Sequence, residues 1–414
     1  MKGGAFMILG IEIINFDVFD DDKCGMLIDD SIAVASGNVE GTGALRLRNL
    51  DALIGRNRTG KSSFILAMSF IKRCIIHDVA QASTLDGRPG FSNMVIDKTR
   101  PAEFKIFFRI KDRASGKTKF LQYELAIEAG KFGSPIVASE KIILSLRNDG
   151  VITKHTLLDL KYGTGIVCFD DNCIDTTIAG DKQTALSVYG KIGTYKDICD
   201  LYHEIDRWFF CNFSSEEVSS YYSDGNAPGG HKHLNSTGSN MSNVLEYMRQ
   251  TDADNYERVI RSIQDRIPAM KKKKTLPANL EGSHDKLFLY LLLLSDRDPH
   301  STIFIETPDR DLYHDMVDVL ADEMREFSIK NPYSQIIFST HNPYIVESMS
   351  PREIWVFSRD FGSEQDDGVK IKCAGSDPVV NALFDEGVGM GAIWYGGHLD
   401  EPGEEDAEED DDDK

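Results

Sequence analysis

The sequence GRNRTGKS, residues 55–62, decides how this chain of 414 residues folds. It fits the pattern Gly-x-x-x-x-Gly-Lys-Ser, a loop that turns its backbone N–H groups inward around phosphate groups. The stretch before it, LRLRNLDALIG, predicts a strand, and KSSFILAMSFIKRCIIHDVA has the apolar spacing of a helix. The motif requires this order, because the helix N-terminus adds a favourable dipole for an anion. The flanking elements therefore favour a phosphate-binding loop over a chance match on a glycine-rich turn.

Each position of the loop has an expected role. We expect Lys61 to reach the β- and γ-phosphates of a nucleotide, and Ser62 to hold Mg²⁺. The other residues that we expect around the phosphates are Gly55, Asn57, Thr59, Gly60 and Ser63.

A second signal is TIFIETPDRDL, residues 302–312, in which a hydrophobic stretch ends in an acid, one residue and a proline. This is the form of a Walker B strand. Glu306 would lie at the carboxyl end of the strand, where a metal-bound phosphate is expected in an open α/β sheet. We therefore assign Glu306 to Mg²⁺ and to catalysis. The alternative is an ordinary strand that ends at a turn.

A third signal is QIIFSTHNP, residues 335–343, another hydrophobic stretch that ends in Ser339, Thr340 and His341. A histidine at this place can form a hydrogen bond with the γ-phosphate and sense whether that phosphate is present. A lone histidine is usually structural. Its position after a strand, downstream of the other two motifs, favours the switch role for His341.

Composition excludes several classes of protein. The net charge is −21, of which the acidic residues 401–414 carry −9, so nucleic-acid binding does not dominate the chain. A local basic patch at residues 271–274 keeps DNA open as a partner. We find no signal peptide and no apolar run of about 18 residues, and we expect a cytoplasmic protein without membrane contact. Seven irregularly spaced cysteines predict reduced thiols.

The remaining sequence divides into β-like and helix-like stretches. Alternating patterns predict strands over residues 102–129 and beyond, and helical spacing covers residues 195–210. Residues 214–240 predict a mobile loop, and residues 242–270 predict one long amphipathic helix. Further helices are expected at residues 285–294 and 312–329. The last fourteen residues predict a disordered acidic tail.

The order of these motifs resembles ABC-type ATPases of the RecF/OLD class. IEIINF near the start looks like the first strand of that family, and LNSTGSNMSNVLEYM, with Gly238 and Asn240, is similar to its segment before the arm helix. The resemblance covers most of residues 7–395. It implies an α/β P-loop NTPase head with a β-rich lobe and an inserted helical arm or lid.

The resemblance also implies boundaries for these parts. The head would span residues 7–400, with a P-loop lobe at about 7–180 and the arm at about 190–275. A lobe with the signature, Walker B and histidine-switch motifs would follow at about 276–395, and residues 401–414 would form the tail. In that family two heads pair head to tail, with ATP between the P-loop of one and a signature segment of the other.

Two departures from the family matter for chemistry. The signature segment falls on residues 280–284, LEGSH, where serine and glycine are replaced or shifted, and Ser283 is our candidate for the contact to ATP from a second copy. Thr307 stands where the family places its general base, and a hydroxyl without a lowered pKa removes a proton from water poorly. Asp309 or Asp311 is the alternative base, and Gln122 is our candidate for the Q-loop glutamine. The Toprim nuclease domain of OLD proteins is not found in the sequence.

The resemblance implies an ATPase that binds ATP and Mg²⁺ and closes a homodimer or a higher oligomer. It would control a separately encoded effector, such as a nuclease, in bacterial defence against phage. Two alternatives stay open: a RecF-like repair ATPase that acts on DNA, and an interaction protein whose acidic tail engages a basic partner. Thr307 and the low isoelectric point favour a slow ATPase that acts as a switch.

Overall fold

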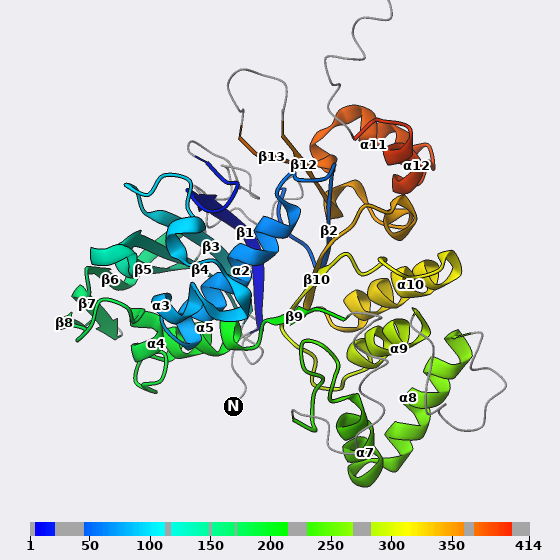
Figure 1. Ribbon diagram of the computed structural model, residues 1–414, viewed down its shortest axis with the longest axis horizontal. Helices are drawn as coiled ribbons and strands as arrows, with labels where there is room; N and C mark the ends of the chain where they lie inside the picture. Colours follow the sequence, from blue (N-terminus) through cyan, green and yellow to red (C-terminus); the bar gives the residue numbers. More distant parts are fainter. Residues whose placement is uncertain are drawn as a thin grey trace, which may run out of the picture.

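Two β-sheets organise the protein, and helices cover them (Figure 1). The computed structural model describes residues 5–20, 45–111, 117–148, 151–169, 172–213, 230–267, 283–359 and 368–399. In Figure 1 the antiparallel sheet with α3 to α5 lies on one side and α7 to α10 on the other, with the parallel strands between them. The expected α/β class is confirmed.

The first sheet has six strands and contains the three sequence motifs. Its order is β13 (Lys370–Cys373), β12 (Ile354–Ser358), β2 (Leu50–Ile54), β11 (Gln335–Ser339), β10 (Thr302–Glu306) and β9 (Phe209–Cys211). Neighbouring strands are parallel except β13, which is antiparallel to β12. Every residue of β2 and β11 is buried, as expected for strands covered on both faces.

The second sheet has seven antiparallel strands. They are β1 (Ala5–Ile14), β3 (Ala102–Lys111), β4 (Thr118–Ala129), β5 (Pro135–Asn148), β6 (Val151–Lys161), β7 (Thr164–Phe169) and β8 (Asn172–Thr177), in that order. Burial alternates along β3, so one face of this sheet contacts the core and the other faces solvent. The β-rich region predicted after the P-loop is therefore confirmed.

One face of the antiparallel sheet packs on helices that follow the P-loop. The rings of Phe16, Phe70 and Phe104 contact one another there, with centroids 5.1 to 6.0 Å apart. The helices are α2 (Lys61–Ile76), α3 (Val79–Ala82), α4 (Ala185–Tyr189) and α5 (Lys196–Asp206). This packing fixes α2, and with it the P-loop, between the two sheets.

A second core lies on the other side of the parallel sheet. Its apolar side chains come from α7 (Met241–Thr251), α8 (Ala253–Arg266), α9 (Ser283–Leu294) and α10 (His314–Lys330). In α9 all ten residues from Asp285 to Leu294 are buried, which makes it a central helix of this core.

Two predictions about these helices were wrong. The single helix expected over residues 242–270 is broken at Asp252, whose carboxylate accepts a hydrogen bond from the Asn255 N–H and caps the start of α8. Aspartate is among the best N-cap residues, and the non-helical backbone of Asp252 ends α7. The helix expected over residues 195–210 ends at Asp206, because Phe209 and Phe210 pair with β10 as strand β9.

The cysteine prediction also needs correction. Cys168 and Cys173 are paired in register across β7 and β8 and form a disulfide, whereas we expected reduced thiols throughout. The CxxxxC spacing is that of two residues facing each other across a tight hairpin, and the sequence alone did not indicate this hairpin. Cys74, Cys199, Cys211 and Cys373 are free thiols.

The C-terminal part holds several further elements. After β11 come the 3-10 turn η6 (Pro343–Val346) and then β12 and β13, followed by α11 (Pro378–Asp385) and α12 (Met390–Tyr395). No helix among the described ranges is long and apolar enough to cross a membrane. The predicted acidic tail, the basic run at residues 271–274 and residues 280–282 of the signature segment lie outside the described residues.

Candidate functional site

The three motifs meet at the carboxyl edge of the parallel sheet. Glu306, the last residue of β10, pairs with Ser339 of β11, and Ser339 pairs with Leu53 of β2. Two residues beyond this level, β2 reaches Gly55 and β11 reaches His341. Ligands in open α/β sheets bind at this edge, so the register alone brings the predicted residues together.

The backbone of the P-loop requires glycine at its start. Gly55 has φ 135° and lies so close to β12 that a Cβ atom would be 2.1 Å from the carbonyl oxygen of Phe357. Gly60, with φ 102°, is the N-cap of α2. Only glycine adopts these conformations without strain, and the result is a tight loop ahead of a helix of 16 residues. The cradle has the shape and dipole that phosphate groups need.

Lys61 lies at the centre of this loop. Its Nζ donates hydrogen bonds to the carbonyls of Gly55 at 2.8 Å and Arg56 at 2.6 Å. Lys61 is buried, and desolvation lowers the pKa of its ammonium to about 8. A buried ammonium that faces loop carbonyls is suited to phosphate oxygens, which would restore a favourable environment for its charge.

The other loop residues divide into structural and accessible groups. Thr59 is buried, and its hydroxyl donates to the Arg56 carbonyl at 2.9 Å, so its side chain supports the loop. Asn57 and Ser62 are exposed, and Ser63 is buried on α2. Among Thr59, Ser62 and Ser63, the exposed hydroxyl is that of Ser62.

The residues expected to hold Mg²⁺ fit that ion. Glu306 is exposed at the end of β10, and both it and Ser62 offer oxygen atoms at the same sheet edge. Magnesium commonly takes one or two protein groups and completes its shell with phosphates and water. Within the described ranges, no cluster of three or more histidine, cysteine or acidic side chains could enclose a metal by itself. Any ion bound here would depend on the nucleotide for its remaining ligands.

Thr307 follows Glu306 in a conformation that is rare for its residue type. Its φ is 47°, in the left-handed region, where a β-branched residue is an outlier. Its backbone N–H donates to the carbonyl of Ser339 at 3.0 Å and lies 3.2 Å from the Ser339 hydroxyl oxygen. Strain of this kind is found mainly at functional sites, where the surrounding structure maintains it.

His341 contacts the P-loop directly. Its ring forms a hydrogen bond with the backbone of Gly55. It also lies close enough to Lys61 for the positive charge of that ammonium to act on it. Desolvation first, and Lys61 second, hold the pKa of His341 below its usual range. A neutral imidazole has one N–H, so His341 can donate to a phosphate oxygen in exchange for its hydrogen bond with the Gly55 backbone, without adding a second charge.

The two candidate replacements for the general base differ in their surroundings. The Asp309 carboxylate accepts a hydrogen bond from Thr340 at 2.7 Å and acts electrostatically on His341. Asp311 acts on the buried Lys286 of α9, and Asp309 does so to a lesser degree. Asp309 therefore belongs to the switch region, and Asp311 lies toward the helical core.

Two predicted residues are not part of this arrangement. Gln122 lies on β4 of the antiparallel sheet, where its amide donates to Glu124, so the structure does not place it with the P-loop. Its assignment was wrong because no strand of the parallel sheet contains it. Ser283 begins α9, and its predicted contact with the ATP of a second copy stays a prediction.

One candidate residue was missed. Asn212 follows β9, and the pairing of Cys211 with Ile305 sets it beside Glu306 at the same edge. It is exposed. A polar residue directly after a hydrophobic run was the available signal, but the helix expected over residues 195–210 concealed it.

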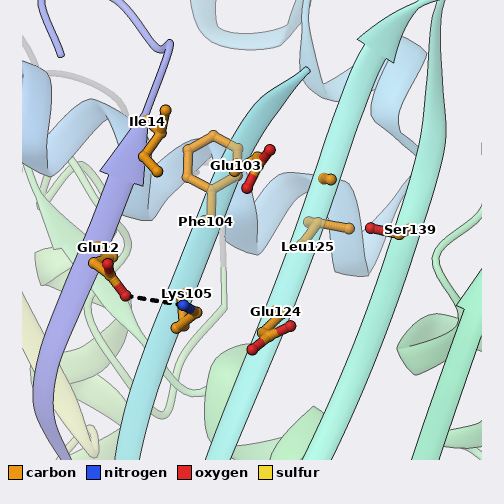
Figure 2. Close-up of a pocket in the computed structure, with 9 residues that line it drawn as sticks. Glu12, Ile14, Glu103, Phe104, Lys105, Glu124, Leu125 and Ser139 are labelled. Carbon is orange, nitrogen blue, oxygen red and sulfur yellow. Dashed lines mark ion pairs between the residues drawn. The ribbon is translucent and has the colours of Figure 1, made fainter. Parts of the chain in front are cut away.

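A pocket of about 130 Å³ lies elsewhere, on the solvent face of the antiparallel sheet (Figure 2). Glu12 of β1, Lys105 of β3 and Glu124 of β4 stand side by side across it, and Lys105 forms an ion pair with Glu12 at 3.1 Å. With Glu103 also in its wall, this pocket is acidic and does not suit phosphates.

The fold and the site define a P-loop NTPase of the ABC type. The chain belongs to the family described as "AAA domain, putative AbiEii toxin, Type IV TA system", whose model matches residues 52–347. That range begins in β2 and extends past His341, so it contains all three motifs. A comparison with curated proteins finds no match.

Solved structures of SMC heads are similar in fold. An SMC head bound to the C-terminal winged-helix domain of ScpA is 11% identical, with a TM-score of 0.44, over 88% of this chain and 96% of that one. The SMC head of Thermotoga maritima is 13% identical, with a TM-score of 0.41, over 88% of this chain and 98% of that one. An SMC head with ScpA from Pyrococcus furiosus is 12% identical, with a TM-score of 0.39, over 89% and 96%.

Proposed function

We propose that the protein is an ATP-dependent switch, in which ATP and Mg²⁺ bind at the P-loop and close a dimer of two heads. The observation that carries this proposal is the convergence of Lys61 and His341 on Gly55, two residues beyond the level of Glu306 at the same sheet edge. A phosphate at Lys61 would lie within the reach of His341. The arrangement therefore suits a ligand whose terminal phosphate can be sensed.

The residues of this chain have separable roles in that function. Lys61 and the loop N–H groups would bind the β- and γ-phosphates, and Ser62 with Glu306 would hold Mg²⁺, which neutralises phosphate charge. His341 would donate to the γ-phosphate and thereby distinguish ATP from ADP. Thr307 would contribute no proton acceptor, so hydrolysis would be slow. A slow reaction gives a long-lived closed state.

The closed state would act on another protein. We propose that it controls a separately encoded effector, such as a nuclease, in the bacterial cytoplasm during defence against phage. Support comes from the resemblance to RecF/OLD-class ATPases and from a family description that names a putative toxin. A role in DNA repair has less support, because the net charge of −21 opposes broad contact with DNA.

Sedimentation equilibrium with ATP·Mg²⁺ and with ADP·Mg²⁺ tests the switch. The expected result is a dimer or larger assembly with ATP and a weaker or absent shift with ADP. His341→Ala should remove the difference between the two nucleotides. His77→Ala, an exposed histidine at the end of α2, is the matched control and should retain it. A wild-type chain that stays monomeric with both nucleotides would contradict the proposal.

A further inference from the structure

The loop after β10, residues 307–311, is held in an unfavourable conformation. Thr307 has φ 47° and Asp311 has φ 63°, both in the region that favours glycine. Within this segment the Arg310 N–H donates to the Thr307 carbonyl, and the N–H of Leu312, directly after it, donates to the Asp309 carbonyl. Such a loop keeps its shape only if neighbouring elements hold it.

On one side, β11 and the residues after it hold this loop. Ser339 accepts from the Thr307 N–H, and the Thr340 hydroxyl donates to Asp309. Thr340 is followed by His341, which contacts Gly55. The loop is thus connected to the P-loop through two consecutive residues.

On the other side, the Lys286 side chain of α9 contacts the loop. The Nζ of Lys286 donates a hydrogen bond to the carbonyl of Arg310 at 2.5 Å, and the carboxylates of Asp311 and Asp309 act on its charge. Lys286 is 3% exposed, and desolvation lowers the pKa of its ammonium. Lysine is almost never so buried unless it is paired, and an apolar residue would suit the remainder of α9 better.

We propose that Lys286 is a positioning residue for the nucleotide site. Its ammonium holds residues 307–311 in the strained conformation that keeps Glu306, Thr307 and His341 arranged around the terminal phosphate. Lys286 also joins the core of α9 to this loop, so α9 and the γ-phosphate site move together. The inference rests on the proposed function, because it concerns the phosphate that the switch senses.

The test separates positioning from general stability. Lys286→Met keeps the length of the side chain and removes the charge and the donor. The matched control is Lys72→Met, because Lys72 is also desolvated and donates to backbone carbonyls, those of Asp206 and Trp208, on a different part of the fold. Both proteins are compared with wild type by equilibrium binding of ATP and ADP, single-turnover hydrolysis and thermal unfolding.

Lys286→Met should bind ADP as wild type does, because Lys61 and the P-loop are untouched. It should bind ATP about tenfold more weakly and hydrolyse it about tenfold more slowly, which corresponds to about 1.4 kcal/mol. Lys72→Met should lose thermal stability but keep the wild-type preference for ATP over ADP. Lys286→Arg, which retains a cationic donor, should recover most of the preference.

The inference is overturned if Lys286→Met keeps the wild-type ratio of ATP to ADP affinity, or if both affinities fall together with stability. If Lys286→Met does not fold, Asp311→Asn is used instead. Asparagine tolerates φ 63° and removes one charge that faces Lys286, so it should reduce the ratio in the same direction. An unchanged ratio in Asp311→Asn then counts against the inference. A wild-type chain that binds neither nucleotide would instead refute the proposed function.

Discussion

Thr340 donates a hydrogen bond to the carboxylate of Asp309, with 2.7 Å between the hydroxyl and carboxylate oxygens. This bond joins the residue before the switch histidine to the loop after the Walker B strand, although 30 residues separate them in sequence. Thr340 is completely buried. The bond therefore connects two of the three motifs on the side of the site where the γ-phosphate would lie.

Removal of this bond should cost both stability and switching. Thr340→Val keeps the shape and deletes the hydroxyl, so Asp309 loses this donor and the Asn342 N–H loses this acceptor, and the free energy of unfolding should fall by about 1–2 kcal/mol. Urea unfolding measures the change. Thr84→Val is the control, since the exposed Thr84 hydroxyl donates only to the nearby Gln81 carbonyl and should contribute less than about 0.5 kcal/mol. Equal losses of unfolding free energy in the two variants would show that the Thr340–Asp309 bond contributes no more than an exposed hydrogen bond.

Gly55 should tolerate no side chain. Gly55→Ala places a methyl group against the Phe357 carbonyl at a φ of 135°, so it should destabilise the fold by about 2–4 kcal/mol and abolish nucleotide binding. Gly87→Ala separates the effect of the positive φ from that of the steric clash, because Gly87 has φ 75° but open space around it. This substitution should lower the free energy of unfolding by only about 1 kcal/mol. Chemical denaturation measures the stability of the two variants, and equilibrium binding measures their affinity for ATP. Normal ATP binding by Gly55→Ala would refute the geometry assigned to the loop.

Hydrolysis should be limited by the missing base at position 307. Thr307→Glu supplies a carboxylate where the related ATPases have one, and a positioned base contributes about 10²–10⁴-fold. Steady-state turnover of the variant should exceed that of wild type, and its closed dimer should be shorter-lived. Wild-type turnover of about 1 s⁻¹ or faster, within the ordinary range for enzymes, would mean that another group is the base. Asp309, beside His341, is then the residue to replace by asparagine.

The affinity for ATP should depend on the protonation of Lys61. Burial lowers its pKa from 10.5 to about 8, so the free protein loses this positive charge as the pH rises above about 8. Bound phosphate favours the charged form, so ATP affinity should fall above about pH 8 and binding there should take up a proton. Calorimetry in buffers of different ionisation enthalpy measures the uptake. An affinity that is constant from pH 7 to 9.5 would contradict this role.

The lowered pKa of Lys61 should also make the stability of the fold depend on pH, in the direction opposite to that of the ATP affinity. Between pH 8 and 10.5 the unfolded chain carries more protons at Lys61 than the folded chain, so this residue makes unfolding less favourable as the pH rises. Stability and ATP affinity should therefore respond to pH in opposite directions through this one group. Lys61→Met should remove both dependences in this range.

The sequence predicted the parts of the site whose signals are local. The P-loop, the strand that ends in Glu306 and the strand before His341 can each be recognised from a stretch of about ten residues. The structure confirms that all three lie at one edge of the parallel sheet. Asn212 was missed because the pattern around Phe209 and Phe210 predicts a helix, and only their pairing with β10 shows that they form a strand. Lys286 was missed because nothing in SHDKLFLYLLLL shows which carbonyl a buried lysine meets. Both depend on contacts between segments that are far apart in the chain.

The central claim is that the loop at residues 55–62 binds ATP through Lys61. Equilibrium binding of labelled ATP to wild type and to Lys61→Ala tests it most directly, with Lys72→Ala, on the same helix, as the control. Loss of charge-assisted contacts to phosphate should cost on the order of 1.5–3 kcal/mol or more, so the Lys61 variant should bind at least about tenfold more weakly while the control binds normally. If folded Lys61→Ala binds ATP as tightly as wild type does, the account of this site is wrong.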